Sequence, residues 1–355
     1  MSAQPVIDAD GHVIESDRDL FEYLEAPYSS HPELLGAPFF PTLDGWNRAA
    51  RRIADGQNLF LESPSPGDWV DFLDQGNIEL AVLFPTNGLG FGLLKDVDWS
   101  VVLARAYNNW LHDSFLKASP RLKGMALIPA QSVPEAIKEL RRAVSDLGMV
   151  GAILPAVGLR KPLGHPDYFP LYAAAQDLDI MLAVHAAPAQ GLGFDGFERL
   201  IEARTLSHPF GQMIQMTSMM YGGVYDAFPR LRVAYMEAGA GWVPYLMERL
   251  DMEYEHRRSQ APQLTQPPSD HLRSGRIFIH SELEEAGLSY ALGRLRDDIF
   301  FMATDYPHER KEGYFAALHE FEERDDLSAQ TKRNIVYETA RRLYKLEVRQ
   351  EALFR

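Results

Sequence analysis

The sequence has 355 residues, of which 46% are hydrophobic and 24% charged, an ordinary globular composition that excludes a disordered chain or a small disulfide-stapled scaffold. Its 35 basic and 50 acidic residues give a net charge of −15. Because that field repels phosphate backbones and anionic lipid, we expect neither nucleic acid nor a membrane surface as a partner.

Cysteine is absent from the sequence, which excludes disulfides, thiolate zinc sites and a cysteine nucleophile. The N-terminus MSAQPVIDAD is polar and leads directly into a strand-like run, so we expect no signal peptide. The apolar runs are far shorter than the roughly 18 residues of a membrane span. We therefore expect a cytoplasmic protein.

Short apolar runs recur along the chain and alternate with helical patterns. In chain order they are Val6-Ile7, Leu80–Phe84, Met125–Ile128, Val150–Leu154, Ile180–Val184, Leu231–Met236, Ile277–Ile279 and Ile299–Met302. Such runs are typical of parallel strands that are buried on both faces. Amphipathic stretches with helix start and stop signals lie between them, among them Ser132–Leu147, Asp167–Leu178 and Trp242–His256. This alternation predicts a (β/α)8 TIM barrel, one α/β domain over residues 1–355.

Two segments interrupt the alternation. Residues 16–75 form an insertion after the first strand, and residues 257–276 have the composition of a polar surface loop. Because insertions at the C-terminal ends of barrel strands often shape the active site, we expect residues 16–75 to form a lid over the barrel mouth. Its aromatic residues favour a packed lid over a substrate clamp: Phe39, Phe40, Trp46, Phe60, Trp69 and Phe72.

Polar side chains end five of the predicted strands, where catalytic residues of TIM barrels are found. They are Asp8, Asp10 and His12 on the first strand, His185 on the fifth, Glu237 on the sixth, His280 and Glu282 on the seventh, and Asp305 and His308 on the eighth. Carboxylates and imidazoles that converge in this way suit one divalent ion such as Zn²⁺ or Mn²⁺. We expect the ligands to be Asp10, His12, His185 and Asp305.

Simpler roles exist for some of these residues. For Asp8, a buried carboxylate held by backbone donors is favoured over a metal ligand. His185 alone could be a core histidine, and Asp305 alone could start a turn. His308 could orient the loop that follows the last strand. The shared position at one end of different strands favours the metal site over these separate roles.

The stretches Val6–Glu15, Val184-His185, Glu237–Asp251 and Thr304–His308 resemble the amidohydrolase-related family, the metal-dependent TIM barrels related to aminocarboxymuconate semialdehyde decarboxylase. The resemblance covers about residues 5–345 in the same order. It implies one divalent ion, usually zinc and in some decarboxylases manganese. Asp10 and His12 match a strand-one motif whose first histidine is here a carboxylate. The catalytic histidine that the family's decarboxylases carry after strand six is here Glu237.

The first functional hypothesis is a metal-dependent, non-oxidative decarboxylase of a small aromatic or unsaturated carboxylic acid. Glu237 or a metal-bound water is expected to transfer the proton, although Glu237 could instead cap the Gly-rich turn that follows it. His208 is a site residue or a helix-start cap, and His280 a pocket or a rim residue. A cation is expected to meet the substrate carboxylate, and Arg48, Arg51 and Arg52 of the insertion are candidates.

The second hypothesis is a hydrolase in which a metal-bound hydroxide attacks an amide, an ester or a related bond and Asp305 accepts its proton. A third is a barrel that has lost its metal and only binds a ligand. The four intact candidate ligands argue against the third. The expected partner is a small-molecule substrate, and a homodimer is expected because symmetric dimers are the commonest assembly.

Overall fold

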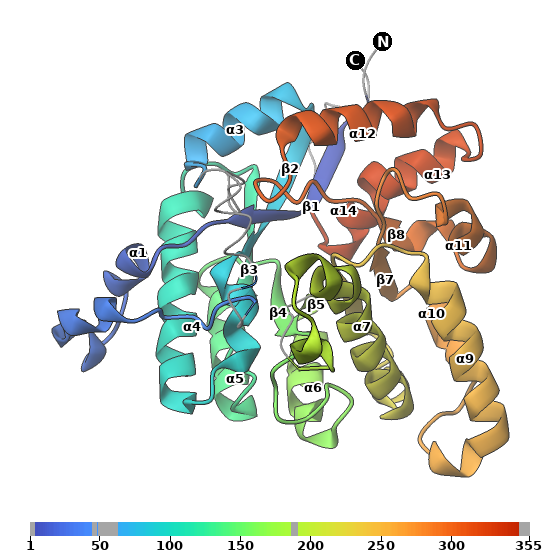
Figure 1. The fold of residues 1–355 in the computed structure, drawn as a ribbon, viewed down its shortest axis with the longest axis horizontal. Coiled ribbons are helices and arrows are strands. Elements are labelled where there is room, and N and C mark those ends of the chain that lie inside the picture. Colours follow the sequence, from blue (N-terminus) through green and yellow to red (C-terminus); the bar gives the residue numbers. More distant parts are fainter. Residues whose placement is uncertain (1–3, 45–47, 49–62, 186–190, 348–355) are drawn as a thin grey trace.

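The computed structural model describes residues 4–44, 48, 63–185 and 191–347. Eight parallel strands form one sheet in the order β1 to β8, in the centre of a ring of helices (Figure 1). The strands are β1 Val6–Val13, β2 Ile78–Pro85, β3 Leu122–Leu127, β4 Gly151–Pro155, β5 Met181–His185, β6 Arg232–Tyr235, β7 Ile277–His280 and β8 Phe300–Phe301. The predicted TIM-barrel fold is therefore confirmed.

The helices between and after the strands cover the outside of the sheet (Figure 1). They are α1 Asp17–Phe21, α3 Pro66–Gln75, α4 Val97–Leu111, α5 Val133–Ser145, α6 Phe169–Asp177, α7 Leu200–Tyr221, α8 Val224–Ala227, α9 Trp242–Arg257, α10 Pro268–Leu272, α11 Leu288–Arg294, α12 Lys311–Glu323, α13 Ala329–Arg333 and α14 Thr339–Leu343. The three predicted helices correspond to α5, α6 and α9. The predicted polar loop at 257–276 is wrong in part, because α10 lies within it and buries Leu272.

The chain after β8 returns to β1 and closes the barrel. The amide of His12 donates to the Tyr306 carbonyl at 2.7 Å, and the amide of Asp305 donates to the Asp10 carbonyl at 3.2 Å. The sequence predicted a strand from the apolar pair Val6-Ile7. β1 is longer than this pair, because the polar residues that follow are also buried in the strand. The barrel thus brings the ends of β1 and β8 together.

The described parts of the insertion pack on the barrel wall. α1 and the segment after it lie beside α4 (Figure 1), where the Phe39 ring is 5.2 Å from the Trp99 ring. On α3, the Trp69 and Phe72 rings lie 5.0 and 4.3 Å from the ring of Tyr306. These aromatic residues are packed, as predicted. Trp46 and Phe60 lie outside the described residues, and the lid over the barrel mouth stays a prediction.

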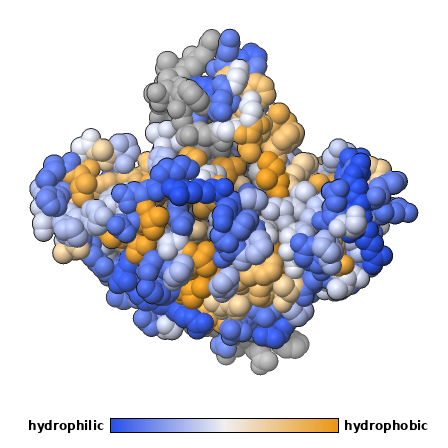
Figure 2. Space-filling model, turned by 90° about the horizontal axis from the view of Figure 1, so that it is seen from below, coloured by the Kyte–Doolittle hydropathy of each residue, from blue (hydrophilic) through white to orange (hydrophobic). Residues whose placement is uncertain are grey.

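One face carries smaller hydrophobic patches between larger hydrophilic areas (Figure 2). Within the described ranges, no helix has both the length and the apolar composition to cross a membrane. The cytoplasmic location stays a prediction.

Candidate metal centre and its cavity

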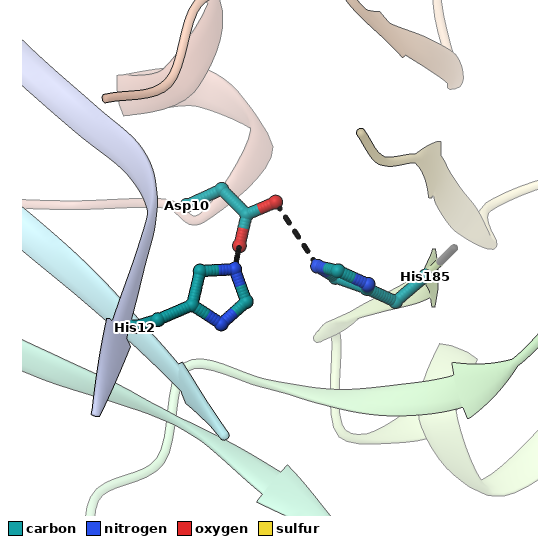
Figure 3. Close-up of side chains that lie close together, drawn as sticks. All are labelled: Asp10, His12 and His185. Atoms are coloured by element: carbon teal, nitrogen blue, oxygen red, sulfur yellow. Dashed lines mark hydrogen bonds and ion pairs between the residues drawn. The ribbon is translucent and has the colours of Figure 1, made fainter. Parts of the chain in front are cut away.

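Asp10, His12 and His185 meet at the C-terminal ends of β1 and β5 (Figure 3). His12 Nε2 lies 3.4 Å from Asp10 Oδ1, and His185 Nε2 lies 3.2 Å from Asp10 Oδ2. One ligand atom from each residue fits within 4.8 Å of the other two, and all three residues are buried. Two atoms bound tetrahedrally to one ion at about 2.0–2.2 Å lie about 3.4 Å apart. The observed separations therefore match those of ligands that share an ion.

The hydrogen bonding of this cluster also fits a metal ion. Asp10 Oδ1 and His12 Nε2 are buried and have no hydrogen-bond partner among the described residues. The other ring nitrogen, His12 Nδ1, lies 2.9 Å from the Pro85 carbonyl, to which it donates. That bond leaves the Nε2 lone pair for a metal. Burial lowers the pKa of His12 to about 3, so the imidazole stays neutral.

Asp305 and His308 lie next to His12. Asp305 Oδ1 is 3.3 Å from His12 Nε2, and these two residues form a second group of candidate ligands with His308. His308 Nδ1 is 2.8 Å from Asp305 Oδ1, its Nε2 is 2.9 Å from Thr86 Oγ1, and its ring stacks on His12 at 4.1 Å. His308 thus orients Asp305, the loop role considered from the sequence.

Asp8 has the structural role that the sequence favoured. Its carboxylate accepts hydrogen bonds from the Thr304 amide at 2.9 Å, from Thr304 Oγ1 at 2.7 Å and from the Asp10 amide at 3.3 Å. Burial nevertheless raises its pKa to about 6. Asp8 therefore holds the end of β8 against β1 and does not belong to the ligand set.

Glu237, which follows β6, also lies next to the ligand set. Its Oε2 lies 3.7 Å from His185 Nδ1, and its Oε1 lies 3.1 Å from His208 Nε2. Burial alone would raise the pKa of Glu237, but the neighbouring His208 and His185 hold it well below its usual range. The carboxylate and the His208 imidazole form a hydrogen-bonded pair next to the candidate ion site.

The structure excludes two of the alternatives that the sequence left open for these residues. His208 is not a helix-start cap, because α7 begins at Leu200 and includes Pro209 in its interior. Pro209 resembled a start signal, but the helix extends through it. Glu237 does not cap the Gly-rich turn, because the amides of Ala240 and Gly241 donate to Glu285 at 2.8 and 2.6 Å. No local pattern in the sequence pointed to Glu285, which is 45 residues from Ala240.

A cavity of about 400 Å³ opens beside the ligand set. Asp10, Glu237 and Asp305 line one part of it, together with His208 and His280. The His280 side chain is 3% exposed, and neither ring nitrogen has a hydrogen-bond partner in the described ranges. His280 is thus a buried pocket residue and not a rim residue.

Two further lining residues were missed from the sequence. The Tyr314 hydroxyl is buried without a hydrogen-bond partner among the described residues, and Arg204 is exposed at the same cavity. Both residues lie on helices, α12 and α7, where surface side chains are the ordinary expectation. Only the fold places them beside the strand ends.

The arginines of the insertion are placed differently. The Arg48 guanidinium pairs with Asp44 at 2.7 Å and donates to the carbonyls of Phe194 at 2.9 Å and Phe197 at 3.3 Å. It is absent from the described lining of the cavity. Arg51 and Arg52 lie outside the described residues. A substrate contact of Arg48 or Arg51 therefore stays a prediction.

The fold and the candidate ligands define a class, a TIM barrel with a candidate N/O metal site at the strand ends. The amidohydrolase family model matches residues 7–346, and the chain belongs to this family.

Individual relatives are more distant. The chain is 24% identical over 266 residues to 2-amino-3-carboxymuconate-6-semialdehyde decarboxylase of Dictyostelium discoideum, covering 73% of this chain and 72% of the relative. It is 25% identical over 341 residues to gamma-resorcylate decarboxylase of a Polaromonas species, covering 91% and 98%. A similar fold occurs in the crystal structure of a dihydroxybenzoic acid decarboxylase from Polaromonas with bound manganese and the inhibitor 2-nitroresorcinol, with TM-score 0.71, 21% identity and 99% coverage of both chains.

Proposed function

We propose that this protein is a metal-dependent, non-oxidative decarboxylase of a small aromatic or unsaturated carboxylic acid. The proposal is carried by two buried ligand atoms, Asp10 Oδ1 and His12 Nε2, which have no hydrogen-bond partner among the described residues and lie beside an acid-lined cavity. The names of the relatives support it, since both curated relatives are decarboxylases.

One divalent ion is proposed at this site, zinc first and manganese second, because the carboxylate and imidazole donors suit both. The bound manganese of the Polaromonas structure supports a divalent ion. Asp10, His12 and His185 would hold it, with Asp305 as the fourth ligand. When bound, the ion supplies positive charge that stabilises anionic oxygens of the substrate.

The chain's own residues would move the proton. Decarboxylation of an aromatic acid requires a proton at the carbon that loses CO2. Glu237 and His208 share a hydrogen bond and both line the cavity, so the pair can deliver a proton there and be reprotonated from the solvent side. Asp305, oriented by His308, would position the substrate or accept a proton. His280, whose ring nitrogens have no hydrogen-bond partner in the described part of the chain, would donate one hydrogen bond to the substrate and accept another.

Two larger-scale features complete the proposal. Residues 16–75 would close over the cavity as a lid, supported by the bonds of Arg48 to the Phe194 and Phe197 carbonyls beyond β5.

Two copies of the chain would form a homodimer. Support comes from exposed apolar side chains on α7 and α9, among them Ile214 and Tyr245, which is 61% exposed.

Product analysis tests the proposed reaction. Protein loaded with zinc or with manganese is incubated with gamma-resorcylate and a panel of related aromatic acids, and CO2 and the decarboxylated ring are quantified. Chelator should remove the activity and added metal should restore it. Cleavage of aryl esters or amides by the same preparation, without CO2 from any acid, would replace the decarboxylase with the hydrolase.

A further inference from the structure

Arg204 occupies a distinctive place in the candidate cavity. It lies on α7 four residues before His208, so the two side chains share one helix face. Both line the cavity that Asp10 and Asp305 also line. Among the described residues of that lining, Arg204 is the one lysine or arginine.

The charge around Arg204 is strongly negative. Six carboxylates line the cavity: Asp10, Glu237, Glu282, Glu284, Asp305 and Glu309. A divalent ion at the strand ends would offset the charge of the carboxylates next to it. Glu282 and Glu284 in the loop after β7, and Glu309 before α12, are exposed. An organic anion that approaches this mouth meets repulsion unless a cation receives it.

The Arg204 guanidinium is available for such a ligand. Glu202, the acidic residue of the first turn of α7, pairs with Arg199 at 2.8 Å. Where the structure describes the chain, Arg204 makes no ion pair and no side-chain hydrogen bond. A guanidinium presents a planar fork that fits both oxygens of a carboxylate. Arg48, by contrast, already pairs with Asp44.

We infer that Arg204 binds the carboxylate of the incoming substrate, and that the acidic mouth restricts the substrate to acids with a single carboxylate. The inference rests on the proposed function, because it assigns the acid's binding partner. Arg204 is exposed, so its contribution is to capture and binding; we expect KM to depend on it more than kcat. A second carboxylate on the ligand would face Glu282 or Glu284 without a cation.

Binding to metal-loaded protein tests the inference. Calorimetry compares gamma-resorcylate with resorcinol, the same ring without its carboxylate, in wild type, Arg204→Gln, Arg204→Lys and the control Arg199→Gln. Arg199 is the N-cap residue of the same helix and is outside the described cavity lining. We expect the wild type to prefer gamma-resorcylate and Arg204→Gln to lose about 10–100-fold of that preference, the size of a charge-assisted hydrogen bond. Arg204→Lys should retain part of it, and Arg199→Gln all of it.

Three results would overturn the inference: a wild type without preference for the carboxylate, a preference that survives Arg204→Gln, or an equal loss in Arg199→Gln. Isophthalate should bind no more tightly than benzoate, and tighter binding would overturn the restriction to one carboxylate. Release of CO2 is measured on the same samples. If the protein releases CO2 but its preference for gamma-resorcylate does not depend on Arg204, the proposed reaction stands and the role of Arg204 is rejected. If Arg204→Gln loses the preference but no acid releases CO2, the anion site stands and decarboxylation is rejected.

Discussion

Asp8 and Asp10 lie two residues apart on β1, and both are almost completely buried. Below the mouth, Asp8 accepts three hydrogen bonds and fastens β1 to Thr304 beyond β8. At the mouth, Asp10 Oδ1 has no hydrogen-bond partner in the described structure and faces His12 Nε2. An unpaired buried carboxylate oxygen is costly unless a ligand compensates it. Burial of a carboxylate therefore does not distinguish a structural from a functional group. What distinguishes them is whether each carboxylate oxygen has a hydrogen-bond partner.

The same contrast holds between the two sides of the barrel mouth. Beside β2, buried Glu15 accepts the amides of Thr86 at 3.0 Å and Gly88 at 2.6 Å, so both oxygens are used. Beside β6 and β7, Glu237 Oε2 and both His280 nitrogens lack hydrogen-bond partners among the described residues. On the β2 side the carboxylate therefore has a structural role, because it holds the backbone that follows β2. The β6–β7 side is where the cavity opens and where a substrate can supply the missing partners.

The largest expected effect separates the two aspartates of β1. Asp10→Asn removes a charged ligand, so metal content should fall and kcat should drop by about 10³-fold or more, since metal charge stabilisation is worth several kcal/mol. Asp8→Asn should keep its metal and most of its activity and lose about 1–2 kcal/mol of stability. Elemental analysis, kinetics and urea unfolding of both variants measure the difference. Full metal content in Asp10→Asn would reject Asp10 as a ligand.

The next effect concerns Glu237. Glu237→Gln keeps the shape and removes the proton-transfer group, so kcat should fall by about 10²–10⁴-fold with metal content unchanged. The control is His256→Gln at the end of α9, where an exposed imidazole lies far along the chain from the strand ends and kcat should not change. A folded, metal-loaded Glu237→Gln enzyme with wild-type kcat would remove Glu237 from the mechanism.

Glu285→Gln gives the opposite pattern at the same turn. The two amides of Ala240 and Gly241 would face one oxygen and an NH2 group, so the free energy of unfolding should fall by about 1–3 kcal/mol. Activity per folded molecule should stay close to that of the wild type, because Glu285 is outside the described cavity lining. Denaturant unfolding and active-site-normalised rates check both points. A large loss of kcat at unchanged stability would assign Glu285 a role in the reaction.

The last prediction is a pH dependence of stability from Glu15. Burial raises its pKa to about 7 in the folded protein, from 4.5. The folded state then binds more protons than the unfolded state between these values, so this group's contribution to stability falls as pH rises from about 4.5 to about 7. Unfolding of metal-free wild type and Glu15→Gln across this range measures it. The stability of the wild type relative to Glu15→Gln should decline with pH, and a constant difference would contradict the shift.

Much of the fold could be predicted from the sequence because its signals are local. The apolar runs located the strands, and Pro134 and Gly148 marked the ends of the segment that contains α5. The candidate ligands were also accessible, because His185 and Asp305 directly follow apolar runs whose C-terminal ends meet in a parallel barrel. The helix-start alternative for His208 was misleading, because α7 begins earlier, at Leu200, and continues through Pro209.

The sequence by itself therefore determined the barrel, the order of its strands and the ends at which polar residues gather, because strand and helix periodicities depend on residues that are close together in the sequence. Only the tertiary structure decided what each polar residue does. Asp8 is paired with Thr304, 296 residues away, and the turn after Glu237 is held by Glu285. Arg204 and Tyr314 reach the cavity from helices. Hydrogen-bond satisfaction depends on partners that the fold brings together, and such pairs leave no pattern in the local sequence.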